Sequence, residues 1–172
     1  MNQNEIHTLI ERQREYFYSN ATLNIDARID ALKRLRKCIQ NHEKAIAAAL
    51  SADLGKSDFE GYMCETGLVL SELSYMLKHI RRFAKEKRVH TPLAQFHSRS
   101  FTKPGPYGVV LVMSPWNYPF LLSLDPLIDA IAAGNTVVLK PSAYSPATSK
   151  LIADMISECF PPELATVVTG GR

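Results

Sequence analysis

The chain has 172 residues, of which 46% are hydrophobic and 22% charged, and its formal net charge is +3. This length is enough for one domain with a hydrophobic core, and so small a charge argues against partners such as nucleic acid or an anionic membrane. The N-terminus lacks the basic start and apolar centre of a signal peptide, and the longest apolar run is too short to span a bilayer. We therefore expect a cytoplasmic protein that has no transmembrane segment.

Residues 1–90 show apolar side chains at helical spacing, which predicts a helical segment that packs on the rest of the chain. The apolar stripes consist of Ile6, Leu9, Ile10 and Phe17; of Ile25, Ile29, Leu32, Ile39, Ile46 and Leu50; and of Val69, Leu73, Met76, Leu77, Ile80 and Phe83. Asn24 is the expected cap of the second stripe, and Gly55 the expected end of the turn that follows it.

Two features of this segment invite a functional interpretation that we reject. Gly55-Lys56-Ser57 imitates the end of a phosphate-binding P-loop, but that motif needs a glycine where Leu50 stands and a strand before it. The basic residues between Arg81 and Arg88 sit at a predicted helix C-terminus, where positive charge interacts favourably with the helix dipole. We expect that cluster to be solvated and to bind no nucleic acid.

The cysteines Cys38, Cys64 and Cys159 are odd in number and have no close spacing. This pattern argues against a disulfide framework and against a zinc site, so no metal is expected. We interpret each as a small apolar helix residue.

Between residues 91 and 106 the helical period stops. Thr91-Pro92 and Pro104-Gly105-Pro106 predict an extended connector with a short exposed strand. One interpretation of that strand is an edge strand of the domain that follows.

Residues 107–172 alternate strands with helices. Apolar runs at Val109–Met113, Thr136–Leu139 and Ala165–Thr169 predict strands, the first of them buried and parallel. A helix over 120–133, with Pro119 at its first position and Gly134 as its stop, and a second from Ser145-Pro146 to about Cys159 connect them. The fold class is therefore α/β, with the first half (β-α-β-α-β) of a doubly wound Rossmann-like nucleotide-binding domain.

Asn117 and Lys140 follow the first and second predicted strands. Because such crossovers are right-handed, both residues are expected at one edge of the sheet, the edge that binds ligands in open α/β folds. The carboxamide of Asn117 can donate hydrogen bonds without titrating, which suits it to hold an oxyanion. From the local sequence alone, a turn cap between Pro115 and Pro119 is an equally good interpretation.

At these residues the chain resembles the aldehyde dehydrogenase superfamily, in Ser114-Pro-Trp-Asn-Tyr-Pro-Phe120 and Ala132-Ala-Gly-Asn-Thr-Val-Val-Leu-Lys-Pro-Ser142, and more weakly in Ala52-Asp-Leu-Gly-Lys56. The N-terminal lead looks most like the class 3 branch, which acts on fatty or aromatic aldehydes. Members of this superfamily are more than twice as long, so the resemblance implies an N-terminal fragment with a truncated aldehyde dehydrogenase fold. It also implies that residues 107–172 are half of an NAD(P)-binding domain, that residues 91–106 are an oligomerisation arm, and that the complete protein is a homodimer.

The resemblance also implies roles for individual residues. Asn117 would hold the oxyanion formed when a cysteine thiolate attacks the aldehyde, and Tyr118 and Leu121 would line the aldehyde tunnel. The cofactor, NAD or NADP, would contact Met113, Ser114, Pro115, Trp116, Lys140, Ser142 and Ala143. Many relatives carry a glutamate where Ala143 stands, a carboxylate that repels a 2′-phosphate; we therefore expect NADP to be accepted at least comparably to NAD.

None of the three cysteines stands in the Gly-Gln-x-Cys-like context of the family's nucleophile. We therefore expect this chain alone to oxidise no aldehyde. Two other functions stay open: a non-catalytic nucleotide-binding or subunit-docking module, and an acyl-phosphate or acyl-thioester reductase of the same superfamily.

Overall fold

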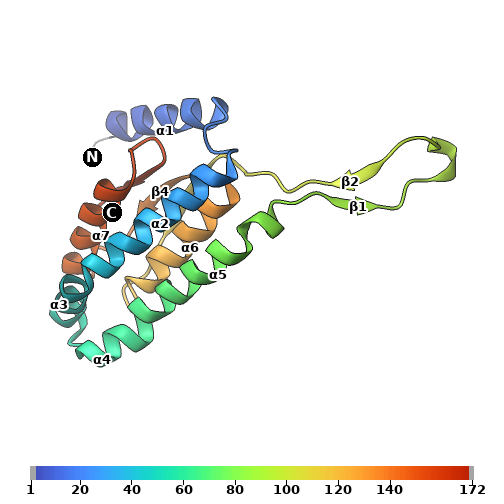
Figure 1. Cartoon of the computed structure of the whole chain (residues 1–172). Coiled ribbons are helices and arrows are strands. Elements are labelled where there is room, and N and C mark those ends of the chain that lie inside the picture. Colours follow the sequence, from blue (N-terminus) through green and yellow to red (C-terminus); the bar gives the residue numbers. More distant parts are fainter. Residues whose placement is uncertain (1–2, 171–172) are drawn as a thin grey trace.

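The computed structural model describes residues 3–170. Residues 1–2 of the predicted segment 1–90 and residues 171–172 of the predicted segment 107–172 lie outside the described residues. A group of helices packs around a small sheet, and one long hairpin projects from this body (Figure 1). None of the described helices is both long and apolar enough to cross a membrane.

The sheet has the predicted connectivity. Strands β3 (Val109–Met113), β4 (Thr136–Lys140) and β5 (Ala165–Val167) pair in parallel in the order β3-β4-β5. Helices α6 (Leu121–Ala133) and α7 (Pro146–Cys159) connect them. The α/β fold class and the β-α-β-α-β order are therefore confirmed.

Strand β3 is less buried than the sequence predicts. Val110 and Val112 pack in or against the core, but Leu111 and Met113 are 60% and 68% exposed. Side chains alternate between the two faces of a strand, and β3 is the edge strand of the described sheet, so Leu111 and Met113 point away from the core. The prediction of a wholly buried strand over these residues was wrong for this reason.

The N-terminal segment is helical through Phe83. Its elements are α1 (Gln3–Tyr18), α2 (Ile25–Asn41), α3 (Glu43–Leu54), α4 (Asp58–Gly61), a π-helical turn η1 (Tyr62–Thr66) and α5 (Gly67–Phe83). Asn24 caps α2 by accepting a hydrogen bond of 2.9 Å from the Asp26 backbone, and Gly55 ends α3 with a left-handed φ of 67°. His42 divides the second apolar stripe between α2 and α3.

Helices α2, α5, α6 and α7 share one hydrophobic core with the sheet, and α1 packs against β3 and β4. Arg28 of α2 is buried in this body and donates hydrogen bonds to the carbonyls of Thr22, Leu23 and Ala132. Its guanidinium lies against Gly134, which ends α6 in the left-handed conformation, at a φ of 95°. The predicted glycine stop is thus also a close-packing point between two helices.

The projecting hairpin consists of β1 (Lys87–Val89) and β2 (Ser100–Thr102), which pair antiparallel, with a single 3-10 turn η2 (Leu93–Gln95) near its tip (Figure 1). Its first strand lies within the range predicted as helical, so the prediction of helix to about residue 90 was wrong. The hairpin forms its own two-stranded sheet, which overturns the interpretation as an edge strand of the following domain.

Candidate active site at the carboxyl edge of the sheet

The ends of β3 and β4 lie side by side. Met113 pairs in register with Lys140, and the Ser114 backbone N–H donates a hydrogen bond of 3.2 Å to the Lys140 carbonyl. The loop that carries Asn117 therefore begins beside Lys140, where the two predicted site segments meet.

Within this loop, Ser114 is buried while Pro115, Trp116, Asn117 and Tyr118 are exposed. The structure gives the Asn117 carboxamide no hydrogen-bond partner among residues 3–170. Such a side chain is available to donate to a ligand, whereas one that only capped the local turn would already be engaged.

A hydroxyl chain anchors the buried start of the loop. Ser123 donates from its hydroxyl to the Pro119 carbonyl at 2.6 Å, and the Ser114 and Ser123 hydroxyls are 2.6 Å apart. Because the Ser123 proton is already committed, Ser114 must donate to Ser123. These bonds tie both ends of the loop to the first turn of α6.

A buried ion pair supports the same loop from the N-terminal segment. Lys56 and Glu65 are 8% and 0% exposed, and the Lys56 ammonium lies 2.5 Å from a Glu65 carboxylate oxygen. The ammonium also donates to the Asn117 carbonyl at 3.2 Å and lies 4.3 Å from the centre of the Tyr118 ring. Its charge is thus shared between a carboxylate, a carbonyl and an aromatic face, and all three contacts fix the backbone around Asn117.

The second oxygen of Glu65 caps helix α6. It accepts hydrogen bonds from the backbone N–H groups of Phe120 at 2.8 Å and Leu121 at 3.1 Å. A carboxylate at a helix N-terminus satisfies unpaired donors and interacts favourably with the dipole. Pro119, predicted at the first helical position, lies two residues before α6, and Leu121, a predicted tunnel residue, packs against the core.

Helix α7 is capped in the same manner. Asp53 of α3 accepts hydrogen bonds from the backbones of Ala147 and Thr148 at 3.0 and 2.7 Å, while the predicted cap, Ser145, makes no side-chain capping bond. Carboxylates from the N-terminal segment therefore occupy the starts of both helices that follow a strand. Since these are the usual anion sites of such folds, neither is open to a dinucleotide phosphate.

Lys140 ends β4 and donates a hydrogen bond of 3.1 Å to the Gly170 carbonyl. A cavity of about 500 Å³ lies beside this point, between the segment after β4, the residues that follow β5, and α7. Its walls include Ser142 and Ala143, and Lys150 and Asp154 of α7 add one charge of each sign. The cavity is thus lined by two of the predicted cofactor contacts and by two charged residues that the sequence did not suggest.

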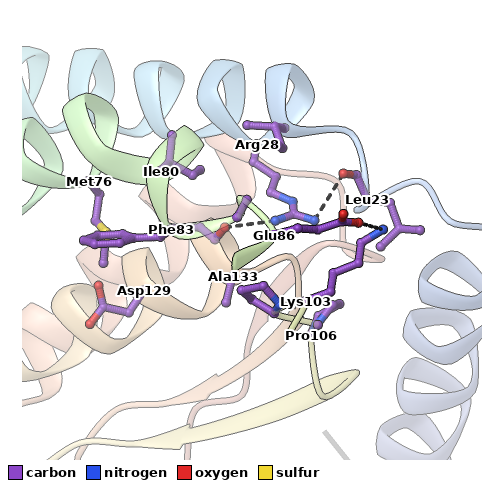
Figure 2. A pocket seen from close by; sticks show the side chains of 15 residues that line it. Leu23, Arg28, Met76, Ile80, Phe83, Glu86, Lys103, Pro106, Asp129 and Ala133 are labelled. Carbon is purple, nitrogen blue, oxygen red and sulfur yellow. Dashed lines mark hydrogen bonds and ion pairs between the residues drawn. The ribbon is translucent and has the colours of Figure 1, made fainter. Parts of the chain in front are cut away.

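A second cavity of about 500 Å³ lies at the root of the hairpin, between α2, α5 and the C-terminal part of α6 (Figure 2). Because α6 has 13 residues that rise about 1.5 Å each, this cavity is about one helix length from the loop that precedes α6. Asp129 borders it, and burial together with the nearby Glu72 raises the pKa of Asp129 to about 6. The position of this cavity, at the far end of α6, excludes the cavity from the strand-end site.

Two of the three cysteines lack the surroundings of a nucleophile. Cys38 and Cys159 are buried in α2 and α7, and burial raises the pKa of both thiols. A catalytic cysteine needs the opposite, an environment that lowers its pKa and exposes the thiolate. Cys64 is half-buried in η1.

Sequence reasoning missed Lys56, Glu65 and Asp53 as parts of this site. Lys56 and Asp53 carried a signal, since both lie in Ala52-Asp-Leu-Gly-Lys56, the weaker of the quoted motifs, whereas Glu65 lies outside every quoted motif.

A model of the aldehyde dehydrogenase family matches residues 1–172. The chain is 42% identical over 165 residues to 4,4'-diapolycopene-4,4'-dial dehydrogenase of Cytobacillus firmus, covering 96% of this chain and 36% of that protein. It is 41% identical to 4,4'-diaponeurosporen-aldehyde dehydrogenase of Staphylococcus aureus, covering 91% of this chain and 34% of the relative. It is 38% identical to aldehyde dehydrogenase family 3 member A2 of Macaca fascicularis, covering 94% and 33%.

Solved structures of aldehyde dehydrogenases also resemble the chain over nearly its whole length. Staphylococcus aureus AldH in its substrate-bound state superposes with a TM-score of 0.95 at 39% identity, over 99% of this chain and 37% of that one. GapN, the glyceraldehyde-3-phosphate dehydrogenase of Methanocaldococcus jannaschii, complexed with NADP, shares the fold at a TM-score of 0.81 and 22% identity, over 99% and 37%. The chain thus spans about a third of the length of the relatives that it matches.

Proposed function

The chain belongs to the aldehyde dehydrogenase family, and on that premise we propose that it supplies the oxyanion donor and part of the dinucleotide site of an NAD(P)-dependent aldehyde dehydrogenase. The observation that carries this proposal is the exposed carboxamide of Asn117. Lys56 and Glu65 fix the loop that carries it, through hydrogen bonds to the backbone of Asn117 and of Phe120. Preorganised donors of this kind stabilise the negative charge that develops on a carbonyl oxygen in the transition state.

The proposed reaction needs a thiolate that attacks the aldehyde carbon, an acceptor for the hydride that then leaves it, and a water molecule. The water hydrolyses the resulting thioester, which releases the carboxylic acid and regenerates the thiol. Asn117 would donate from its amide nitrogen to the oxygen of the tetrahedral adduct. The nucleophile would be a cysteine outside these 172 residues, because burial raises the pKa of Cys38 and Cys159 and because relatives are about three times as long. The nicotinamide group, when bound, supplies the hydride acceptor.

The residues at the strand ends fit the adenosine side of a dinucleotide. The cavity beside Ser142 and Ala143 lies at the carboxyl edge of the sheet, where such ligands bind in open α/β folds. Lys140 beside the cavity and Lys150 in its wall provide positive charge, Asp154 one turn further along α7 provides a carboxylate, and position 143 is an alanine. This supports acceptance of NADP as well as NAD, since a point-charge lysine can pair with a 2′-phosphate. Met113, Pro115, Trp116 and Tyr118 are exposed beside the same edge and would contact cofactor or substrate.

For the substrate we propose an aldehyde with a long apolar chain. Two relatives at about 41–42% identity are named for apolar polyene aldehydes, and others are family 3 members. We further propose that the β1–β2 hairpin is an arm that joins a second copy, because the hairpin projects from the body (Figure 1) and carries four exposed apolar residues, Val89, Leu93, Phe96 and Phe101. Homodimer formation and a cytoplasmic location stay predictions.

The test is turnover by the full-length protein with a panel of long-chain, polyene and aromatic aldehydes and either dinucleotide. Aldehyde-dependent reduction of NAD or NADP without phosphate or a thiol acceptor would support the proposal. Turnover only with an acyl phosphate or acyl thioester would instead identify the reductase alternative. Dinucleotide binding without any turnover would identify a non-catalytic module.

A further inference from the structure

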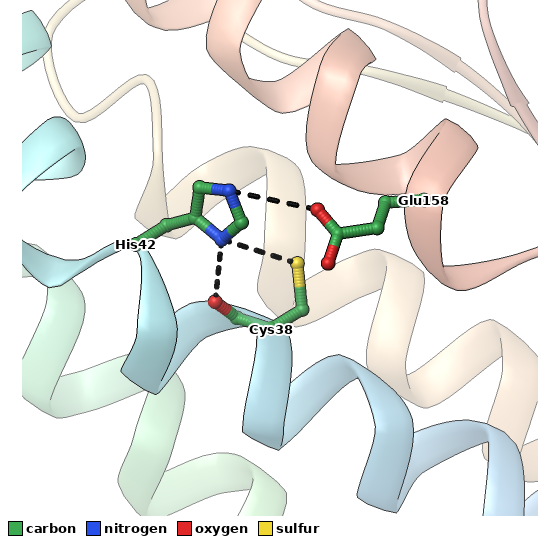
Figure 3. A group of neighbouring side chains, drawn as sticks. All are labelled: Cys38, His42 and Glu158. Atoms are coloured by element: carbon green, nitrogen blue, oxygen red, sulfur yellow. Dashed lines mark hydrogen bonds and ion pairs between the residues drawn. The ribbon is translucent and has the colours of Figure 1, made fainter.

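A second group of ligand-forming side chains lies where the C-terminal ends of α2 and α7 meet, and none of its members lines the strand-end cavity. Cys38 lies in the last turn of α2, His42 directly follows that helix, and Glu158 faces them from α7 (Figure 3). The Cys38 thiol lies 3.6 Å from His42 Nδ1, and His42 Nε2 lies 3.5 Å from Glu158 Oε2. Cysteine, histidine and glutamate together form a ligand set typical of zinc.

The hydrogen bonds of His42 leave the correct nitrogen available. Nδ1 lies 2.9 Å from the Cys38 backbone carbonyl, which can only accept, so Nδ1 carries the proton. Nε2 then presents its lone pair toward the Glu158 carboxylate. Zinc-bound histidines commonly have this arrangement, in which a backbone carbonyl fixes the tautomer and orients the ring.

The three residues lie close enough together to reach the geometry of a tetrahedral zinc ion after small side-chain movements. Bonds of about 2.3 Å to sulfur and about 2.0 Å to nitrogen and oxygen place neighbouring ligand atoms about 3.3–3.6 Å apart. In the structure each residue offers one ligand atom, with a ring nitrogen for His42, and these atoms lie within 4.8 Å of one another. A separation at the upper end of this range must shorten by about 1.2–1.5 Å to reach zinc geometry. The side chains of His42 and Glu158 are 32% and 56% exposed, which leaves room for such movement.

Charge and access also suit a divalent cation. With a thiolate, a neutral imidazole and a carboxylate, the ligands carry two negative charges, which balance a zinc ion. Cys38 is buried at 4% exposure, while the side chains of His42 and Glu158 are 32% and 56% exposed. An ion could therefore enter from solvent on the side of His42 and Glu158.

We propose that Cys38, His42 and Glu158 bind one zinc ion, with water in the fourth position, and that this ion clips α2 to α7. Cysteine spacing alone gives no hint of such a site, since it needs one cysteine and a histidine one turn later. The site is distinct from the proposed oxyanion loop and does not depend on the proposed function.

The experiment measures zinc bound to the full-length protein, kept reduced, after metal removal and dialysis against zinc. We expect one ion in this site, and we expect cobalt in its place to give a thiolate-to-metal charge-transfer band. Cys38→Ser should abolish that band, and both Cys38→Ser and Glu158→Gln should weaken zinc binding by about tenfold or more. Cys64→Ser, which leaves the cluster intact, should change neither.

Absence of bound zinc, or equal zinc affinity in Glu158→Gln and the unaltered protein, would overturn the proposal. Glu158 is exposed, so this variant remains informative even where Cys38→Ser fails to fold. A charge-transfer band that survives in Cys38→Ser would likewise assign the ion to another cysteine.

Discussion

Replacing Glu65 with glutamine tests how the oxyanion loop is held. The side chain is 0% exposed and accepts three hydrogen bonds, at 2.5 Å from Lys56, 2.8 Å from Phe120 and 3.1 Å from Leu121. Glutamine keeps the volume but removes the charge, so the buried Lys56 ammonium loses its counter-ion. Breaking a buried pair in this way costs about 3–5 kcal/mol of folding free energy.

The assay is urea unfolding of the full-length protein, paired with kcat for an accepted aldehyde. Glu11→Gln, in the exposed Arg14–Glu11 pair, is the matched control and should change stability by about 0.5 kcal/mol or less. A second variant, Lys56→Met with Glu65→Leu, should recover much of the lost stability, because an apolar pair leaves no buried charge.

That double variant should nevertheless keep a low kcat, because neither the Asn117 carbonyl nor the start of α6 regains a partner. The reasoning is refuted if Glu65→Gln unfolds with the stability of the Glu11→Gln control. It is equally refuted if the double variant has normal kcat, since the pair would then not position the loop.

Three further outcomes are expected of the full-length protein. Ala143→Glu should lower kcat/KM for NADP by about tenfold or more and leave that for NAD unchanged, since it adds a like charge beside the 2′-phosphate; an unchanged NADP/NAD ratio would count against it. Gly134→Ala should destabilise by about 1–3 kcal/mol, because φ is 95° and a Cβ would lie 2.6 Å from a buried guanidinium, whereas Gly105→Ala, with open space around it, should be near neutral in thermal unfolding. Burial first, and then neighbouring carboxylates, raise the pKa of Asp125 and of Asp129 from 3.8 to about 6. The folded state therefore binds more protons than the unfolded state between these values, and stability should fall as pH rises through this window; Asp129→Asn should flatten the pH profile of the urea midpoint.

The sequence predicts much of the α/β half because its signals are local. Apolar runs of strand length mark the three strands, and Gly134 marks the end of α6 through a backbone conformation that glycine adopts readily. The handedness of crossovers predicts Asn117 and Lys140 at one edge of the sheet. The observed pairing of Met113 with Lys140 agrees with this prediction.

The missed features depend on contacts between distant segments. Lys56 meets the Asn117 carbonyl across 61 residues, and no spacing rule anticipates that contact. The hairpin strands are three residues long, and Lys87 and Arg88 give no apolar alternation to detect. The exposure of Leu111 likewise depends on which strand ends the sheet, which the apolar run itself does not reveal.

The central claim is that Asn117 holds the oxyanion, and the rate of the first NAD(P)H formed in a single turnover tests it most directly. In Asn117→Ala of the full-length protein this rate should fall by about 10²–10³, with dinucleotide affinity, measured by fluorescence, unchanged. An undiminished single-turnover rate would contradict the account.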